Sequence, residues 1–165
     1  MRVAKFSKKL HLFDVDAIDR NILRGLQSNG RVTNADLAES IGLSPAACHK
    51  RVKRLEEGGI IQSYTAIIDR RAAGCSQSVF VQITLESQGS EALEAFETTV
   101  VNCPQIVECH LMTGDYDYQL HVIVRDAEEY EQLHRDLLTK LPGVARLTSS
   151  FALRTVRRTS EVPIK

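Results

Sequence analysis

The 165-residue sequence predicts an α+β protein with two domains, a helical domain first and a β-α-β-β-α-β domain after it. Up to about residue 59, apolar residues recur at helical spacing, and from Ser78 onwards several segments alternate with the period of a strand. The charged residues are also distributed unevenly between the two halves of the chain. Residues 1–71 hold 13 Lys and Arg against 8 Asp and Glu, and residues 72–165 hold 8 against 13. This asymmetry favours a nucleic-acid partner for the first half only.

The composition is typical of a globular protein in water, with 43% hydrophobic and 25% charged residues. No apolar run approaches the roughly 20 residues that span a bilayer, and the N-terminal residues lack the apolar core of a signal peptide. We therefore expect a cytoplasmic protein with no membrane partner. The cysteines form no CxxC pair and match no zinc spacing, so we expect them to be reduced. They are Cys48, Cys75, Cys103 and Cys109.

A flexible arm is expected over residues 1–15, and the first helix follows it. Asp16 and Asp19 form a capping pair for this helix, which Asn29 and Gly30 bring to an end. Its apolar stripe consists of Ile18, Ile22 and Leu26.

The stretch from Thr33 to Gly59 predicts two further short helices joined by a tight turn. Thr33 caps the first of them, Gly42 fits the left-handed position after its end, and Ser44 caps the second. Pro45 suits the first position of the second helix, where no N–H is needed. The inner face of the second helix is formed by Cys48, Val52 and Leu55. This pattern is typical of a helix-turn-helix motif.

The second helix of the motif combines small residues at its start with cations further along. A helix that enters the major groove end-on needs little bulk at its start, and its later cations reach bases and phosphates. We expect Lys50, Arg51 and Arg54 to project from the exposed face. The complete set of expected DNA-binding residues is Thr33, Ser44, Ala46, Ala47, His49, Lys50, Arg51 and Arg54. The alternative is an ordinary αα-hairpin whose cations only face water.

Residues 60–69 are β-branched and aromatic, which predicts a strand. The strand could be a wing beside the helices or the link to the next domain. We place the DNA-binding domain at residues 16–69 and a hinge at residues 70–77, where Gly74 lies.

The second domain is expected over residues 78–156, with a C-terminal tail over residues 157–165. Its elements are strands 78–85, 106–112, 118–124 and 144–156 and helices that begin near Ser90 and after Asp126. This order is that of the ferredoxin-like fold, in which helices cover one face of the sheet. The other face is expected to hold Gln82, Glu108, His110, Gln119 and His121. A half-apolar sheet face left bare predicts a homodimer through this domain.

Several motifs in order carry a family resemblance. They are DAIDRNIL (16–23), the run from Asn34 to Ile61, GDYDYQL (114–120), PGV (142–144) and TSSFAL (148–153). Through them the chain resembles the Lrp/AsnC, or feast/famine, transcriptional regulators. The resemblance implies a winged helix-turn-helix domain joined to a βαββαβ effector domain of the RAM or ACT type. It also implies binding to double-stranded DNA, and dimers that assemble into tetramers, octamers or larger discs, with a small amino acid bound near the interfaces between dimers.

The loop TGDYD is the main candidate for the effector site. Gly114 allows a backbone turn that frees N–H groups for a carboxylate, and Asp115 or Asp117 could pair with an ammonium group. The residues alone favour a simpler reading, an acidic β-hairpin turn. The resemblance assigns the effector to this loop, and the last strand supplies weaker candidates. The expected effector residues are Thr113, Gly114, Asp115, Tyr116, Asp117, Thr148, Ser149 and Ser150.

Catalytic and metal chemistry are not expected. The sequence has no GxSxG, HExxH or phosphate-loop motif. His110 and His121 are predicted to lie roughly opposite each other on paired strands, and Glu108 is the one candidate for a third metal ligand. A solvated or interfacial His pair is the preferred interpretation. We therefore expect an effector-responsive DNA-binding regulator with no catalytic residue and no cofactor. The alternatives are a constitutive architectural DNA-binding protein and a small-molecule-binding α+β domain with no DNA role.

Overall fold

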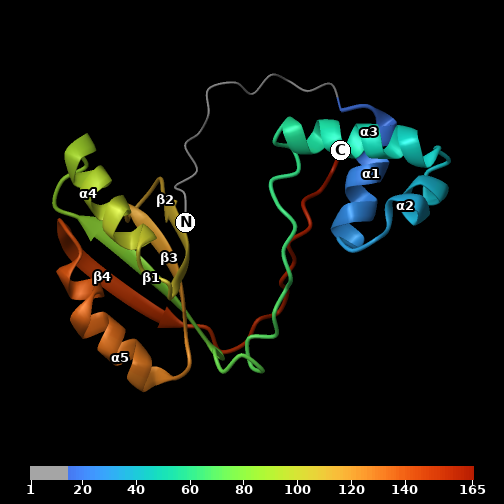
Figure 1. The fold of residues 1–165 in the computed structure, drawn as a ribbon. Helices are drawn as coiled ribbons and strands as arrows, with labels where there is room; N and C mark the ends of the chain where they lie inside the picture. The colour runs from blue at the N-terminus through green and yellow to red at the C-terminus, as the bar shows by residue number, and fades with distance from the viewer. Residues whose placement is uncertain (1–14) are drawn as a thin grey trace. The chain divides into compact units, whose positions relative to one another are not determined.

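The computed structural model describes residues 15–165, which fold as two compact units (Figure 1). The helical unit comprises the described residues up to Ile67 together with Arg157–Lys165, and the α/β unit comprises Ile68–Val156. The arm predicted over residues 1–15 lies outside the described residues except for Val15. No helix in the described part of the chain is both long enough and apolar enough to cross a bilayer.

The helical unit consists of three helices, α1 (Ala17–Ser28), α2 (Asn34–Ser40) and α3 (Pro45–Glu57). Their fully or nearly buried apolar residues form one core, against which the predicted stripe residues Ile18, Leu26 and Val52 also pack. The core residues are Ile22, Leu37, Ala38, Cys48 and Leu55. The expected three-helix arrangement is therefore the one observed, because each helix has one apolar face and only the other two helices can bury it.

The helix boundaries follow the predicted caps. Asp16 and Asp19 form a reciprocal capping box at the start of α1, and Thr33 and Ser44 cap α2 and α3 through their hydroxyl oxygens. Gly42 has a φ of 70°, as expected for the left-handed residue that ends a helix. Local side-chain chemistry thus sets the turn between α2 and α3.

The predicted strand over residues 60–69 is absent, and this prediction is wrong. The segment from Gln62 to Ile68 is neither helix nor strand, and Ile67 and Ile68 are 71% and 60% exposed. Branched residues favour an extended backbone, but a strand also needs a neighbouring strand with which to exchange hydrogen bonds. Residues 60–69 have no such ladder partner within the described chain.

The α/β unit contains the predicted order of strands and helices. These are β1 (Gln77–Leu85), α4 (Ser90–Val101), β2 (Ile106–Leu111), β3 (Tyr118–Val124), α5 (Ala127–Asp136), a 3₁₀ turn (Leu138–Lys140) and β4 (Val144–Phe151). The sheet order is β2-β3-β1-β4 with antiparallel neighbours, as the ferredoxin-like fold requires. The last strand ends at Phe151 and not at Val156, so the prediction for its C-terminal end is corrected.

The two faces of the sheet differ sharply. One face carries Val79, Val81 and Ile83 and is buried under α4 and α5, whose Phe96 and Leu133 belong to the same core (Figure 1). Strand alternation and register put a second set of side chains on the opposite face. That face, called the bare face below, carries Phe80, Gln82, Glu108, His110, Gln119, His121, Thr148 and Ser150. The five residues predicted for this face are therefore placed correctly.

The C-terminal tail belongs to the helical unit rather than to the unit that precedes it. The side-chain amide of Gln27 on α1 makes two hydrogen bonds to the backbone of Val162. The Val162 amide donates to Gln27 Oε1 at 2.7 Å, and Gln27 Nε2 donates to the Val162 carbonyl at 3.2 Å. Arg24 Nη2 donates to the Ile164 carbonyl at 3.0 Å. The chain therefore passes from one unit to the other twice.

Candidate nucleic-acid interface and effector site

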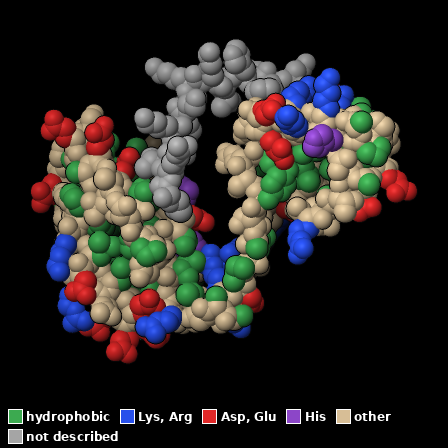
Figure 2. Space-filling model, in the orientation of Figure 1, with side chains coloured by type: hydrophobic (Ala, Val, Ile, Leu, Met, Phe, Trp, Pro, Cys, Tyr) green, Lys and Arg blue, Asp and Glu red, His purple; other side chains and the backbone are tan. Residues whose placement is uncertain are grey.

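The exposed face of α3 carries Ala46, Lys50 and Lys53, on the side of the helix opposite the buried Cys48 and Leu55. Figure 2 shows Lys and Arg side chains gathered over α3. This face is narrow at its N-terminal end and basic further along. That combination suits a helix that enters the major groove, where small residues allow close approach and cations meet bases and phosphates.

Lys53 is absent from the residue set predicted from the sequence, although its side chain is 63% exposed. The spacing of Ala46, Lys50 and Lys53 at i, i+4 and i+7 is the signal that identifies it. Lys53 Nζ lies 3.7 Å from Glu57 Oε1, an exposed pair that holds the side chain only weakly. His49 is also exposed and lies beside this face.

Thr33 and Ser44 lie at helix N-termini, where their hydroxyl oxygens accept backbone amides. The Thr33 hydroxyl also donates to Asp36 Oδ2 at 2.7 Å. Thr33 Oγ1 accepts the amide three positions further on at 3.1 Å, and Ser44 Oγ does the same at 3.2 Å. Asn34 Nδ2 donates to the Pro45 carbonyl at 2.9 Å and so fixes the start of α3 against α2. The small predicted residues at that start, Ala46 and Ala47, are thus presented by a firmly held helix end.

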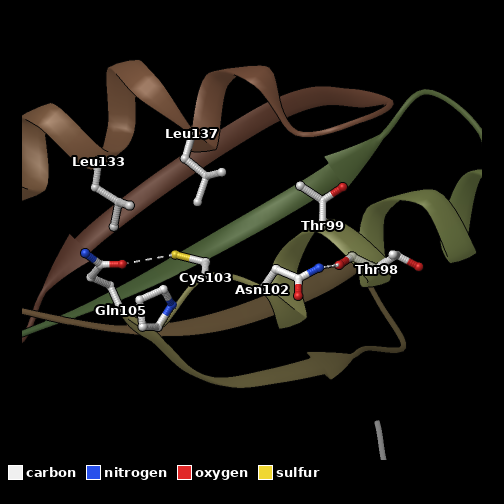
Figure 3. A pocket seen from close by; sticks show the side chains of 8 residues that line it. Thr98, Thr99, Asn102, Cys103, Gln105, Leu133 and Leu137 are labelled. Carbon is white, nitrogen blue, oxygen red and sulfur yellow. Dashed lines mark hydrogen bonds between the residues drawn. The ribbon is translucent and has the colours of Figure 1, made fainter. Parts of the chain in front are cut away.

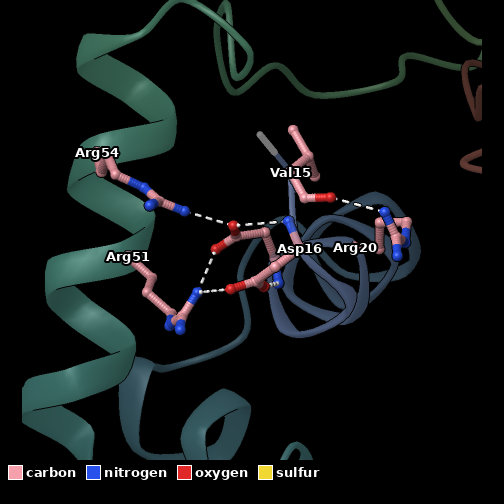
Figure 4. A network of polar contacts seen from close by, with 6 residues as sticks. Val15, Asp16, Arg20, Arg51 and Arg54 are labelled. Carbon is pink, nitrogen blue, oxygen red and sulfur yellow. Dashed lines mark hydrogen bonds and ion pairs between the residues drawn. The ribbon is translucent and has the colours of Figure 1, made fainter. Parts of the chain in front are cut away.

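Arg51 and Arg54 lie on the flank of α3 that faces α1. The predicted exposure is corrected for Arg51, which is half-buried, whereas Arg54 is exposed but also engaged by a carboxylate. Arg51 Nη1 donates to Asp16 Oδ2 at 2.7 Å and to Asp19 Oδ1 at 2.9 Å, and Arg54 Nη2 donates to Asp19 Oδ2 (Figure 4). Along the helix, Arg51 lies between two buried positions and so borders the buried stripe. These four residues form what we call the Asp19 network.

The Asp19 network also changes proton affinities. The pKa of Asp16 falls from 3.8 to about 2, chiefly because the Asp19 amide donates to its carboxylate and secondarily because Arg51 does. The same hydrogen bonds, first that to Asp16 and then that to Asp19, raise the pKa of the Arg51 guanidinium. Both changes favour the charged forms that hold α1 and α3 together.

The predicted effector loop forms the turn between β2 and β3, and its residues have different roles. Gly114 has a φ of 130°, a value that residues with a Cβ rarely adopt. Thr113 and Asp115 are exposed, and Tyr116 is half-buried. The turn therefore presents one accessible carboxylate, that of Asp115, beside a glycine backbone.

Asp117 differs from Asp115 because the residue is only 8% exposed and its carboxylate already accepts hydrogen bonds. Asp117 Oδ2 accepts the Leu85 amide at 2.7 Å, and Oδ1 accepts Gln88 Nε2 at 2.6 Å. Its own amide donates to the Ile83 carbonyl at 2.8 Å. These bonds tie the turn to the end of β1 and leave Asp115 as the carboxylate open to a ligand.

The predicted residues of β4 point to both faces of the sheet. Ser149 lies on the helix-covered face, where its Oγ is hydrogen-bonded to the Tyr130 hydroxyl. Thr148 and Ser150 lie on the bare face opposite Gln82 and Phe80 of β1. The structure therefore does not gather the eight predicted effector residues into one pocket within a single chain.

His110 and His121 do not lie directly opposite each other, so that prediction is corrected: in the β2–β3 register His121 pairs with Glu108 and His110 pairs with Gln119. Both imidazoles instead lie near the Glu108 carboxylate on the bare face. Glu108 Oε2 lies 3.8 Å from His110 Nε2 and 3.6 Å from His121 Nδ1. His121 also stacks on Phe80 with ring centroids 4.6 Å apart, and its Nε2 is 3.2 Å from Ser78 Oγ. No trio of His, Cys, Asp or Glu among residues 15–165 is arranged to hold a metal ion. The geometry fits an ordered polar cluster on a sheet surface.

One shallow groove lies between the end of α4 and α5 (Figure 3). Cys103 lies on one wall, with its Sγ 3.4 Å from Gln105 Oε1, and Leu133 and Leu137 lie on the other. No residue predicted for the effector site lines this groove.

Comparisons with known proteins agree with both units. A family model described as winged helix-turn-helix DNA-binding matches residues 15–62, and one described as the Lrp/AsnC ligand binding domain matches residues 78–162. The chain is 42% identical over 159 residues to the leucine-responsive regulatory protein of Escherichia coli K12, covering 96% of this chain and 97% of that protein.

Solved structures give the same result over the whole fold. A transcriptional regulator of Neisseria meningitidis in complex with L-Met has a TM-score of 0.85 at 32% identity, with 90% of this chain and 96% of that chain covered. An AsnC family transcriptional regulator of Agrobacterium tumefaciens has a TM-score of 0.86 at 35% identity, with the same coverage. With a DNA-binding helix-turn-helix unit and a ligand-binding α/β unit matched along nearly its full length, the chain belongs to the Lrp/AsnC family of transcriptional regulators.

Proposed function

We propose that α3 reads the major groove through its exposed face and that a small amino acid bound to the α/β unit controls this binding. The observation that carries the DNA proposal is the uncovered stripe of Ala46, Lys50 and Lys53 on a helix whose other side is buried. Small residues and cations in this order suit a recognition helix.

The other predicted DNA contacts keep a place in this proposal according to their position. Ser44 and Ala47 lie at the N-terminus of α3, where backbone amides can approach phosphates. His49 flanks the exposed stripe, and Thr33 lies exposed at the start of α2. Arg51 and Arg54 are assigned a different role below, because both already bind carboxylates.

The proposed effector site is the turn of residues 113–115. Its Gly114 backbone suits a ligand carboxylate, and the exposed Asp115 suits a ligand ammonium group. Support comes from the L-Met complex of the Neisseria meningitidis regulator, which has the same fold. Thr148 and Ser150 join the site only if a second chain covers the bare face. Asp117 supports the site indirectly, because its carboxylate accepts hydrogen bonds from Leu85 and Gln88 and so holds the turn in place.

We further propose that two chains pair through the bare face of the sheet and that such dimers assemble into tetramers or octamers in the cytoplasm. The bare face combines Phe80, which is 40% exposed, with His121 stacked against it. A mixed apolar and polar sheet surface of this kind gains stability when a symmetric copy covers it.

The decisive experiment is a thermal-melt screen of the full chain against each common amino acid, followed by DNA titration with and without the amino acid that raises the Tm. A ligand that binds only the folded state raises the Tm, by an amount that grows with the logarithm of its concentration relative to its Kd. We expect one or a few amino acids to do so and to change DNA affinity several-fold, a typical allosteric coupling. A chain that binds DNA but responds to no amino acid would be a constitutive architectural protein.

A further inference from the structure

Asp19 joins α1 to α3 from a fully buried position. Its carboxylate accepts hydrogen bonds from the Asp16 amide at 3.2 Å, from Arg51 Nη1 at 2.9 Å and from Arg54 Nη2. A buried carboxylate without such partners is strongly unfavourable. The folded helical unit therefore keeps both guanidinium groups on the α1 flank of α3.

The charges of the Asp19 network cancel. Asp16 and Asp19 supply two negative charges, and Arg51 and Arg54 supply two positive charges. The four side chains of the Asp19 network, two at the N-terminus of α1 and two on α3, thus add no net attraction for the phosphates of DNA. The remaining cations of α3 are Lys50 and Lys53, whose side chains are exposed on the face opposite the core. Lys53 makes an exposed ion pair with Glu57, which holds it weakly.

The two arginines are nevertheless close to the surface. Arg54 is 48% exposed and Arg51 is 28% exposed, and each is held by only one of its terminal nitrogens. A guanidinium on a long side chain can swing towards solvent once its carboxylate partner is lost. Asp19 is the partner that both arginines share.

We propose that Asp19 is a positioning residue for DNA recognition, which holds Arg51 and Arg54 against α1 and so limits their binding to phosphates of any sequence. Sequence-independent affinity grows with the number of cations that reach phosphates. Specificity depends on the difference between the affinity for the correct site and this background. By restraining two cations beside the exposed face of α3, Asp19 keeps the sequence-independent affinity for DNA low. This inference rests on the proposal that α3 binds DNA.

The test is Asp19→Asn in the full chain, with two DNA probes. One probe is a random-sequence duplex pool, and the other is a duplex that the parent protein selects from that pool. We expect the variant to bind the random pool more tightly. The salt slope, which is the slope of the logarithm of the binding constant against the logarithm of the salt concentration, should be steeper by about 0.9 for each phosphate that a released arginine contacts. The ratio of affinities for the selected and random duplexes should fall.

A merely structural role for Asp19 gives a different result. Loss of folded protein lowers the affinity for both probes and does not steepen the salt slope. Far-UV circular dichroism shows whether Asp19→Asn is folded. If it is not, Asp16→Asn decides, because Asp16 is 47% exposed and holds only Arg51. It should change the slope in the same direction by a smaller amount.

Glu39→Gln is the matched control, since Glu39 is exposed on α2 and lies outside the Asp19 network. It removes the same charge from the same unit without releasing an arginine, so its salt slope should match that of the parent. An equal steepening in Glu39→Gln, or an unchanged slope in the folded Asp19 or Asp16 variant, overturns the inference. A parent chain that binds neither probe overturns the DNA-binding proposal itself and is therefore a distinct outcome.

Discussion

The Asp117 carboxylate accepts the Leu85 amide at 2.7 Å and thereby ties the β2–β3 turn to the last residue of β1. Asp115, two residues earlier, is exposed on the same turn. Two acidic residues that look equivalent in the sequence thus differ in the structure: the Asp117 carboxylate is bound within the chain, and the Asp115 carboxylate, which we propose meets a ligand, is exposed.

This division predicts different effects for two matched substitutions. Asp117→Ala should lower the free energy of unfolding by about 1–3 kcal/mol, because it leaves the buried Leu85 amide without an acceptor. Asp115→Ala should leave unfolding nearly unchanged and weaken amino-acid binding. Urea denaturation and calorimetry on both variants measure the two quantities. Equal effector affinity in Asp115→Ala and the parent would place the effector elsewhere.

The exposed lysines of α3 predict how the affinity for DNA depends on the salt concentration. Lys50→Ala and Lys53→Ala should each weaken binding to duplex DNA and reduce the salt slope by about 0.9 for a lost phosphate contact. Lys140→Ala is the control, because that lysine is exposed on the 3₁₀ turn of the α/β unit. Fluorescence anisotropy at several salt concentrations gives the slopes. Lysine variants that behave like Lys140→Ala would show that this face does not touch DNA.

The depressed pKa of Asp16 predicts how the helical unit responds to acid. The folded pKa of about 2 lies below the usual aspartate value of 3.8, so ionised Asp16 stabilises the fold above about pH 4. That contribution is lost as the pH falls towards 2. Asp16→Asn should remove this part of the pH dependence, which denaturation midpoints across this range will show. A parent and variant with parallel acid profiles would contradict the assignment.

The close packing around Gly25 predicts how a larger residue there would change the stability of the helical unit. A Cβ added at Gly25 would lie 2.8 Å from Leu37 Cδ1, a side chain that is 3% exposed. Leu37 belongs to the packed core, so its displacement should cost about 1–3 kcal/mol. We expect this cost to exceed the roughly 1 kcal/mol that alanine gains over glycine inside a helix, so that Gly25→Ala destabilises the helical unit. At Gly30 the nearest atom would be 3.8 Å away, so Gly30→Ala is the matched control. Chemical denaturation of both variants compares them, and equal stabilities would argue against a tight contact here.

The bare face of the sheet predicts the site of dimerisation. Phe80→Glu should convert the dimer to a monomer, because it places a charge in the middle of the proposed interface. Ala95→Glu adds the same charge to an exposed position on α4 and should leave the assembly unchanged. Light scattering distinguishes these outcomes. A dimeric Phe80→Glu variant would direct attention to another surface.

The fold was largely predictable because its signals are local. Capping residues such as Thr33 and Ser44 act within three positions, and strand alternation acts within a few residues. The site was less predictable because its decisive contacts join distant residues. Arg51 reaches Asp19 across 32 positions, as Asp117 reaches Leu85. The local pattern identifies these side chains as charged, and only the tertiary structure identifies them as already engaged.

The return of the chain to the helical unit has a consequence for evolution and engineering. Since Arg157–Lys165 packs with α1, the α/β unit is topologically an insertion within the DNA-binding unit. A chimera that exchanges one sensor for another must therefore be spliced at two junctions, near residue 68 and near residue 156. A single junction after α3 would remove the backbone groups that Gln27 and Arg24 bind, and it would leave the helical unit without the C-terminal segment that packs on α1.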